Sequence, residues 1–229
     1  MTQQAAVLDM PVAKPAPMPK DTPKTAGAAI RVFAGNLSPQ IIFAMALPAT
    51  AARVWLGEWT LNDLWIALAI VAYWPFNEWL IHVFMLHYRP VKIFGRTIDF
   101  KLPQTHREHH GNPWHLPRVF IPRHTFVFTV PIFALIVWLS PDMRLGLTFT
   151  VVYLWMGLNY EWSHYLAHIG WCPPLAYYQR RVREHRLHHF RNENYWWGVS
   201  LGLADRVLGT APDPASVGRS ETTGNPLAR

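Results

Sequence analysis

Four apolar stretches alternate with polar connections along the chain: Ile41–Leu56, Trp65–Leu86, Thr125–Ser140 and Leu145–Leu158. A helix that crosses a bilayer needs about 20 predominantly apolar residues. Some of these stretches are shorter and become polar at one end, and polar residues inside a membrane are costly unless they serve a site. The pattern predicts an all-α integral membrane bundle of about four transmembrane helices. Buried core helices of a soluble protein are the alternative.

Polar, proline-rich segments flank this part of the chain. In residues 1–35, prolines alternate with Ala, Lys and Thr, and the continuous apolar run of a signal peptide is absent. We therefore expect residues 1–35 to be a disordered cytoplasmic tail that stays on the protein. We assign residues 36–212 to one catalytic domain and residues 213–229 to a flexible C-terminal tail.

The basic residues are distributed asymmetrically. Nineteen of the 21 Lys and Arg residues precede residue 32, lie in the connection 88–124 or follow His164, and the other two are Arg53 and Arg144. Because cytoplasmic segments of membrane proteins carry the excess of Lys and Arg, we expect both termini to be cytoplasmic, in the inner (cell) membrane if the protein is bacterial. A charged fraction of 15% and 12 tryptophans favour a membrane surface over nucleic acid as the partner of the net charge of +7.

Ten of the 12 histidines form four clusters, all on the side predicted to be cytoplasmic. The clusters are His82 and His87; His106, His109 and His110; His164 and His168; and His185, His188 and His189. Neutral imidazole is the commonest metal ligand. The single cysteine, Cys172, excludes an internal disulfide and a thiolate-rich metal site. The clusters predict a centre of more than one metal in a cytoplasmic, histidine-rich helical cap.

The spacing of the histidines is helical. In each H-x-x-H-H motif, positions i, i+3 and i+4 lie on one helical face, which predicts three imidazoles that converge on one metal. His164 and His168, at i and i+4, also share a face. His82 and His87 are five residues apart and do not share a face of a regular helix. Either they bind different metals or the helix departs from regular geometry between them.

Polar and aromatic residues near the clusters are candidates for supporting roles. A ligand imidazole donates its second N–H to an acceptor, and the nearby candidates are Asn77, Glu78, Asn159 and Glu161. Candidates to line a lipid access route are Trp155, Met156, Tyr160 and Trp162, and the alternative is that they simply face lipid or pack in the core. His115 and His124 fit no motif, so we leave them out of the site.

The order of the four clusters resembles the fatty acid hydroxylase/sterol desaturase superfamily from about Asn77 to Thr210. The segment after the last cluster is also similar to the family's closing segment, at Asn194-Tyr195, Gly198, Asp205, Gly209 and Thr210. Ala204 stands where many members carry tryptophan, and Trp196-Trp197 is unusual. These departures leave the histidine clusters intact.

The resemblance implies a lipid hydroxylase or desaturase that uses two iron ions and O2 as co-substrate. Fatty acyl, sterol and sphingolipid substrates all fit the superfamily, and zinc can replace iron in preparations. The sequence has no evident flavin, haem or ferredoxin motif, so the resemblance implies electrons from a separate ferredoxin or cytochrome and its reductase. The ten clustered histidines are the implied metal ligands.

Two other functions remain open. A carotenoid ring hydroxylase of the same superfamily would carry the same clusters. A membrane metal-binding or transport protein is the alternative from another class, although transporters place ligands near the bilayer midplane and these clusters lie toward one face. A zinc-dependent hydrolase is disfavoured because the sequence lacks H-E-x-x-H.

Overall fold

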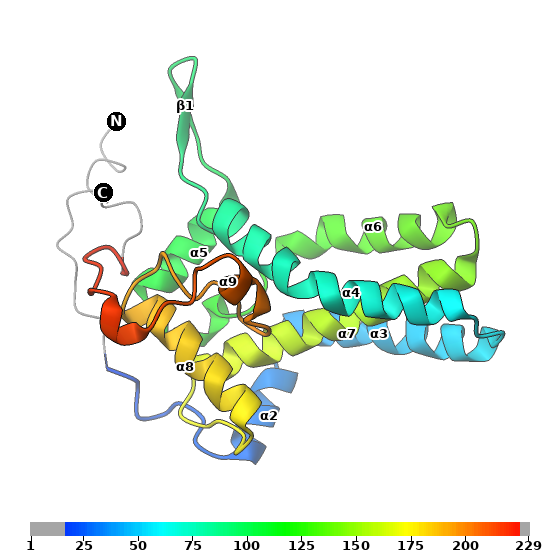
Figure 1. Ribbon diagram of the computed structural model, residues 1–229, viewed down its shortest axis with the longest axis horizontal. Helices are drawn as coiled ribbons and strands as arrows, with labels where there is room; N and C mark the ends of the chain where they lie inside the picture. The colour runs from blue at the N-terminus through cyan, green and yellow to red at the C-terminus, as the bar shows by residue number, and fades with distance from the viewer. Residues whose placement is uncertain (1–16, 225–229) are drawn as a thin grey trace.

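The computed structural model describes residues 17–224, which are mostly helical (Figure 1). The longer helices are α2 (Ala26–Ala34), α3 (Leu37–Leu56), α4 (Leu61–Leu80), α5 (Lys101–Gly111), α6 (Phe126–Leu139), α7 (Met143–Ala167) and α8 (Ala176–Phe190). The short helices are η1 (Ile81–Leu86), η2 (Leu116–Arg118), η3 (Arg123–Thr125), α9 (Leu203–Val207) and η4 (Pro214–Ser216). Two strands, β1 (Val91–Ile93) and β2 (Arg96–Ile98), pair as an antiparallel hairpin.

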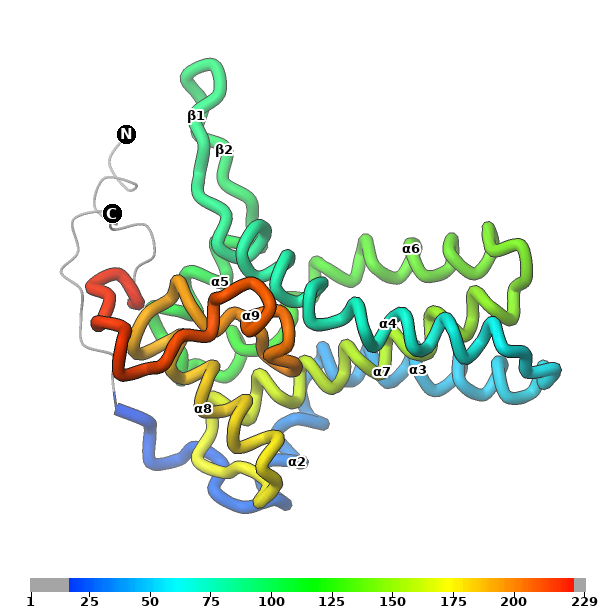
Figure 2. The backbone as a smooth tube through the Cα atoms, in the orientation of Figure 1, coloured from blue at the N-terminus to red at the C-terminus, as the bar shows by residue number. Residues whose placement is uncertain are grey.

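Helices α3, α4, α6 and α7 run along the long axis of the molecule and form a bundle in which α7 packs against the other three (Figures 1 and 2). Three helical segments are long and apolar enough to cross a membrane: Leu37–Leu56, Leu61–Leu86 and Leu116–Leu139. Helix α7 lies beside them, but its second half carries Asn159, Glu161 and His164, which lower its apolar character. The predicted helical membrane bundle is confirmed, and the fourth span remains a prediction.

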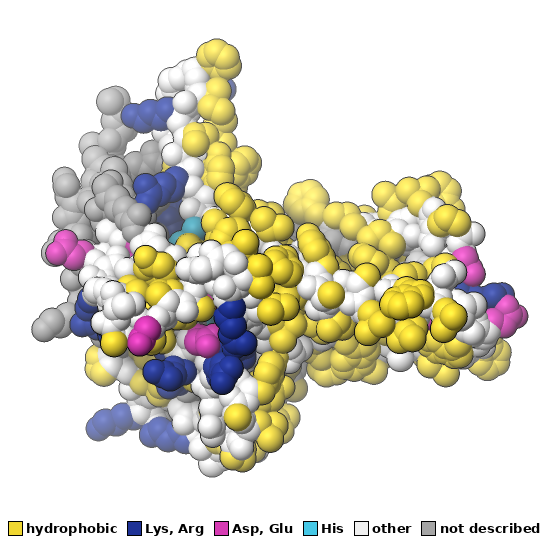
Figure 3. Space-filling model, viewed as in Figure 1, with side chains coloured by type: hydrophobic (Ala, Val, Ile, Leu, Met, Phe, Trp, Pro, Cys, Tyr) yellow, Lys and Arg dark blue, Asp and Glu magenta, His cyan; other side chains and the backbone are white. Residues whose placement is uncertain are grey.

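The cap lies at one end of this bundle and contains α5, α8, α9 and the C-terminal segment (Figure 1). In Figure 3, Lys and Arg side chains gather over the cap, the flank of the bundle is mainly hydrophobic, and a few charges reappear at its far end. This distribution agrees with the asymmetry of basic residues along the sequence.

Three parts of the chain differ from the sequence-based expectations. The hairpin β1–β2 interrupts an otherwise helical fold. Helix α2 forms inside the segment expected to be disordered, because Ala29 and Phe33 are buried by packing that a local pattern does not reveal; residues 1–16 lie outside the described part of the chain. Residues 213–224 of the expected flexible C-terminal tail instead pack against the cap, where Val217, Thr222 and Thr223 are buried; residues 225–229 lie outside the described part of the chain.

Aromatic side chains attach α2 to the bundle. The ring centroid of Phe33 lies 4.9 Å from Trp162, 5.7 Å from Tyr165 and 6.0 Å from Phe120. The Tyr165 hydroxyl donates a hydrogen bond of 3.2 Å to the Ala29 carbonyl. These contacts hold α2 against the end of α7 that carries His164 and His168.

A buried ion pair joins the helices at the far end of the bundle. The Arg53 guanidinium lies 2.6 Å from the Asp63 carboxylate, and the two side chains are 2% and 6% exposed. Arg53 also donates to Thr148 of α7 at 2.8 Å and to the Gly57 carbonyl at 2.7 Å. Asp63 accepts from the backbone N–H of Thr60 at 2.8 Å and so caps the start of α4. One charge pair therefore connects α3, α4 and α7.

We expect Asp63→Ala to destabilise the protein by about 3–5 kcal/mol, because it leaves the Arg53 charge buried without a partner. The matched control is Glu58→Ala, which removes the exposed partner of Arg144 and should cost less than about 1 kcal/mol. Thermal unfolding of both purified variants measures the difference. Equal unfolding temperatures for the two variants would contradict the role of the buried pair.

Candidate metal centre

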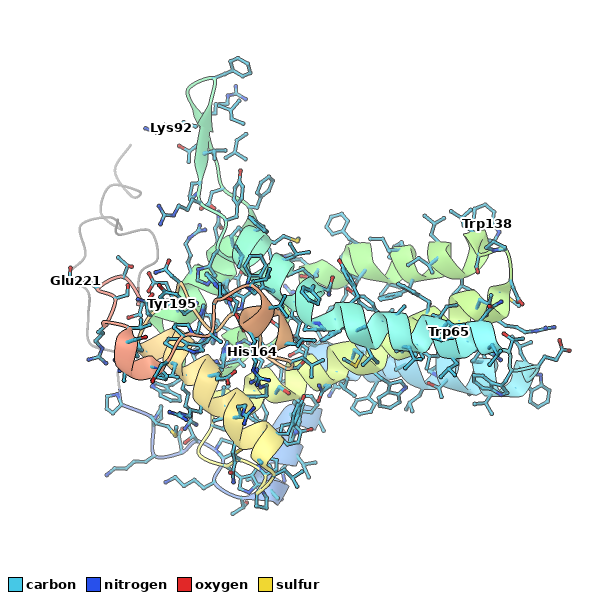
Figure 4. All side chains as sticks on the ribbon, viewed as in Figure 1. Trp65, Lys92, Trp138, His164, Tyr195 and Glu221 are labelled. Atoms are coloured by element: carbon cyan, nitrogen blue, oxygen red, sulfur yellow. The ribbon has the colours of Figure 1, made fainter. Side chains whose placement is uncertain are left out.

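The ten clustered histidines meet where the bundle joins the cap, and His164 marks this place in Figure 4. They form two groups, and within each group the candidate ligand nitrogens lie within 4.8 Å of one another. The first group contains His82, His87, His106, His110 and His188, and the second contains His109, His164, His168, His185 and His189. The two groups adjoin, since the ring centroids of His110 and His189 are 4.2 Å apart.

A π-helical turn brings His82 and His87 into the same group. Helix α4 continues into η1, where the N–H of His87 donates to the carbonyl of His82 at 3.0 Å. In a π-helix the hydrogen bonds run between residues i and i+5, so residues five apart lie above one another. The ring centroids of the two histidines are 5.1 Å apart. Of the two alternatives that the spacing left open, the structure supports the irregular helix.

Each H-x-x-H-H motif divides between the two groups. His106 and His110 of α5 join the first group and His109 the second, whereas His185 and His189 of α8 join the second and His188 the first. The prediction that three imidazoles of one motif converge on one metal is therefore wrong. Positions i+3 and i+4 are separated by about 100° around a helix. The adjacent histidines of each motif therefore point in different directions, one toward each group.

Backbone carbonyls fix the orientation of three imidazoles. The Nδ1 atoms of His82, His110 and His188 lie 2.6, 3.1 and 2.9 Å from the carbonyl oxygens of Trp197, Thr223 and Tyr195. A carbonyl oxygen only accepts hydrogen bonds, so each Nδ1 carries the proton and each Nε2 of the neutral ring carries a lone pair. These acceptors could not be predicted from residue types, because any residue supplies a backbone carbonyl.

The Nε2 atoms of His110 and His188 are 3.2 Å apart and both carry lone pairs. Facing lone pairs repel unless a cation lies between them. Two nitrogens that bind one ion at about 2.1 Å are separated by roughly 3–3.4 Å. The Nε2 atoms of His82 and His106, at 3.2 Å, and of His185 and His189, at 3.0 Å, have the same spacing. The residues present therefore fit one metal ion in each group.

Burial keeps these histidines neutral. His109 and His188 are fully buried, and His185 is 1% exposed. Desolvation, reinforced by the neighbouring histidines, lowers the pKa of each of these three rings well below the usual 6.5, and burial lowers the pKa of His110 to about 3. Only a neutral imidazole has a lone pair to offer a metal, so the site is ready to bind metal at neutral pH.

The segment after α8 shapes the first group. The Asp205 carboxylate accepts hydrogen bonds from the N–H groups of Trp197 at 3.0 Å and Gly198 at 2.6 Å and from the Thr210 hydroxyl at 2.6 Å. This arrangement directs the Trp197 carbonyl toward His82. The C-terminal segment is held in a similar way, because the Thr222 hydroxyl donates to Glu193 beside the Thr223 carbonyl.

The four polar residues expected to accept a hydrogen bond from a ligand imidazole contact other partners among the described residues. Glu78 accepts from the N–H groups of Ser200 at 3.1 Å and Leu201 at 3.2 Å, and Glu161 accepts from the Ile121 N–H at 2.9 Å. Asn77 donates to the Tyr153 hydroxyl at 3.1 Å, and Asn159 to the Tyr177 hydroxyl at 3.0 Å. These residues hold together the segments that carry the histidines and do not bond to the rings themselves.

The remaining candidates lie in different places. Tyr160 is adjacent to His164, with ring centroids 5.9 Å apart. Trp162 packs into the α2 aromatic cluster, which supports core packing, whereas Trp155 donates to Thr50 of α3 at 3.1 Å and is 37% exposed. His115 and His124 lie in neither group.

Comparison with known proteins gives a consistent result. The family model for fatty acid hydroxylases matches residues 67–210, more than half of the chain. A dihydroceramide fatty acyl 2-hydroxylase of Arabidopsis thaliana is 28% identical over 144 residues, which cover 61% of this chain and 57% of that protein. A fatty acid 2-hydroxylase of Mus musculus is 27% identical over 182 residues, 79% of this chain and 45% of that protein. The chain thus spans about half the length of these curated relatives.

A solved structure described as full-length scs7p, with only the hydroxylase domain visible, has the same fold. The TM-score is 0.66 at 20% sequence identity, and the alignment covers 93% of this chain and 81% of that chain.

The two groups should lose metal independently. We expect about two metal ions per chain in the purified protein and about one after His106→Ala with His188→Ala, which removes two ligands from the first group only. His109→Ala with His168→Ala should remove the other ion. The control is His115→Ala, an exposed histidine outside both groups. Elemental analysis measures the content, and an unchanged ratio in both double variants would exclude this assignment.

Acid should destabilise the metal-free protein. Histidines with a lowered pKa stay neutral in the folded state while the unfolded chain binds protons below pH 6.5, so the free energy of unfolding falls as the pH decreases from 6.5 toward the pKa of the folded state. Thermal unfolding of the chelator-treated protein at a series of pH values measures this. Constant or increasing stability between neutral pH and pH 5 would contradict the burial of neutral rings.

Proposed function

The chain belongs to the fatty acid hydroxylase family, and we propose that it is an integral membrane oxidoreductase that hydroxylates a fatty acyl chain at C2, the carbon beside the carbonyl. The relatives named above are fatty acyl 2-hydroxylases, and hydroxylases are oxidoreductases. The proposed reaction inserts one oxygen atom of O2 into a C–H bond and reduces the other to water with two electrons and two protons.

The observation that carries this proposal is the pair of adjoining all-histidine groups with facing Nε2 atoms. Two iron ions bound by the ten histidines would supply the activation of O2 for attack on an unactivated C–H bond. The chain contributes the neutral nitrogen donors, the backbone acceptors that fix their rings, and a buried location that excludes water. Zinc binds the same donors, so the metal found in a preparation does not by itself identify the working metal.

The position of the site along the bundle supports attack at C2. His82 lies in the last turns of the candidate span Leu61–Leu86, and His164 lies in the last turn of α7. The centre is thus at the end of the spans, where a lipid carries its polar head group. C2 is one bond from the acyl carbonyl, whereas a mid-chain carbon lies deep in the hydrocarbon layer. A site at this depth favours C2 hydroxylation over mid-chain desaturation.

Polar side chains at the same level suit the acyl head group. Asn77 pairs with Tyr153, and Asn159 pairs with Tyr177, whose hydroxyl donates to the Ser200 carbonyl at 2.8 Å. Asn77, Tyr153 and Asn159 are half-buried, and Tyr177 is 39% exposed. We propose that they offer hydrogen bonds to the carboxyl or amide of the substrate while the acyl chain stays among the apolar helices.

The proposed topology places the cap, the centre and both ends of the chain in the cytoplasm. The excess of Lys and Arg on the cap side supports this orientation. A separate reductase system would then deliver electrons to the cap from the cytoplasm. The basic surface of the cap suits an acidic electron-donor protein.

Membranes that contain the iron-loaded protein, a reductase system, NAD(P)H and O2 should convert fatty acyl lipids into 2-hydroxy products. With 18O2 the label should appear in the new hydroxyl group, and a substrate deuterated at C2 should lose one deuterium. His168→Ala should abolish the product because it removes a candidate ligand from the second group, whereas the control His115→Ala should keep activity. Mass spectrometry of the lipids measures both.

Each alternative result is informative. A product lighter by two hydrogens and free of 18O would replace hydroxylation with desaturation. A hydroxylated carotenoid or sterol in place of a 2-hydroxy acyl chain would correct the substrate class. Product formation without O2 would overturn the oxygenase assignment and favour a metal-binding or hydrolytic function.

A further inference from the structure

The hairpin β1–β2 projects from the junction of bundle and cap, roughly perpendicular to the long axis of the bundle (Figures 1 and 2). Its apolar side chains are unusually exposed for a protein in water. Val91 is 36% exposed, Ile93 45%, Phe100 57%, and Phe94 at the tip is fully exposed. A two-stranded hairpin alone is marginally stable in water, so these side chains need a partner.

The two faces of the hairpin differ in chemistry. Val91 pairs with Ile98, Ile93 with Arg96 and Lys92 with Thr97. Cross-strand partners lie on the same face, so the three aliphatic residues share one face with Arg96 near the tip, and the other face carries Lys92 and Thr97. In Figure 3 hydrophobic side chains follow the side of the hairpin nearer the bundle and continue into the apolar bundle surface. Lys92 points to the opposite side in Figure 4.

The turn at the tip is energetically unfavourable unless the Phe94 side chain lies in an apolar environment. Phe94 and Gly95 both have positive φ, at 48° and 76°, as in a two-residue type I′ turn. Asn, Asp or Gly is favoured at the first of these positions, whereas a bulky residue there is strained. A fully exposed Phe at this position gains nothing from folding in water, but it gains free energy in a lipid interface.

The base of the hairpin is rigidly connected to the metal centre. Arg107 of α5 donates two hydrogen bonds to the Asp99 carboxylate, at 2.6 and 2.7 Å, and one to the Tyr88 carbonyl at 3.0 Å. The rings of Tyr88 and Phe100 lie 5.5 Å apart across the base. The hairpin therefore keeps a fixed orientation relative to α5.

We propose that the hairpin is a membrane anchor that lies in the surface of the bilayer crossed by the bundle, with Phe94 and the aliphatic face in the headgroup–acyl boundary. Its basic residues Arg89, Lys92 and Arg96 are exposed and suit the phosphates of anionic phospholipids. The partner is a lipid surface because the aliphatic face continues the apolar surface of helices that are able to cross a membrane.

The anchor would set the depth of the metal centre. The hairpin joins η1 to α5, and these two elements with His87 at the end of η1 carry five of the ten clustered histidines. Attachment of the hairpin to the headgroup layer would hold both elements at a constant distance from the lipid. This role adds to the proposed hydroxylase function but does not depend on it.

Spin labels on the chain of 229 residues test the proposal. In a Cys172→Ser background, Phe94→Cys places a label at the tip, and Thr97→Cys is the matched control on the polar face. The labelled proteins are reconstituted into vesicles of phosphatidylcholine and phosphatidylglycerol, and retained metal content checks the fold. We expect the ratio of O2 to nickel-chelate accessibility to be several-fold higher at position 94 than at position 97, because O2 concentrates in lipid and the chelate in water.

Equal ratios at the two positions, or a higher chelate accessibility at position 94, would overturn the anchor. Spin–spin broadening at position 94 that disappears on dilution with unlabelled protein would also overturn it, by identifying a second copy of the chain as the partner. Neither measurement needs enzymatic turnover, so failure of the anchor is distinguishable from failure of the proposed hydroxylase.

Discussion

The rest of this structure depends on the imidazole Nε2 lone pairs that face one another where the bundle joins the cap. The buried side chains of α5 are Pro103 and three histidines, and those of α8 are Arg181, Val182 and three histidines. The cap helices therefore have little hydrophobic core of their own, and shared cations are the interaction that best explains why they pack face to face. Metal binding would then stabilise the packed cap helices further, whereas the bundle is held by apolar packing and the Arg53–Asp63 pair.

Features that arise from local periodicity or composition were predictable from the sequence. The apolar stretches indicated the bundle, the Lys and Arg distribution indicated a basic cap, and the spacing of the ten histidines indicated that they would lie close together, as they do in the candidate site. These features depend on side-chain type and helical spacing alone. That His109 belongs to a different group from His106 and His110 was not predictable. It depends on which histidines of other segments lie beside each face of α5.

Features that depend on the backbone or on distant packing could not be read from residue types. The carbonyls of Tyr195, Trp197 and Thr223 orient three histidines, yet the side chains at those positions carry no sign of this function. Glu78 and Glu161 have the chemistry of imidazole acceptors but bond to loop N–H groups, since those groups lie closer in the folded chain. Residues 213–224 have the composition of a tail, and their fixed position comes from contacts with His110, Arg191 and Glu193.

The π-helical turn at η1 has a consequence for the relation between the two halves of the chain. A π turn is equivalent to one extra residue in an α-helix, and His82-x4-His87 exceeds His164-x3-His168 by one residue. Without that residue the first pair would have the i, i+4 spacing of the second, and each half would read as a helical hairpin, an H-x3-H pair and an H-x-x-H-H motif. The π turn thus absorbs the one-residue difference between the two pairs, and each group still combines one such pair with two histidines of one H-x-x-H-H motif and one of the other.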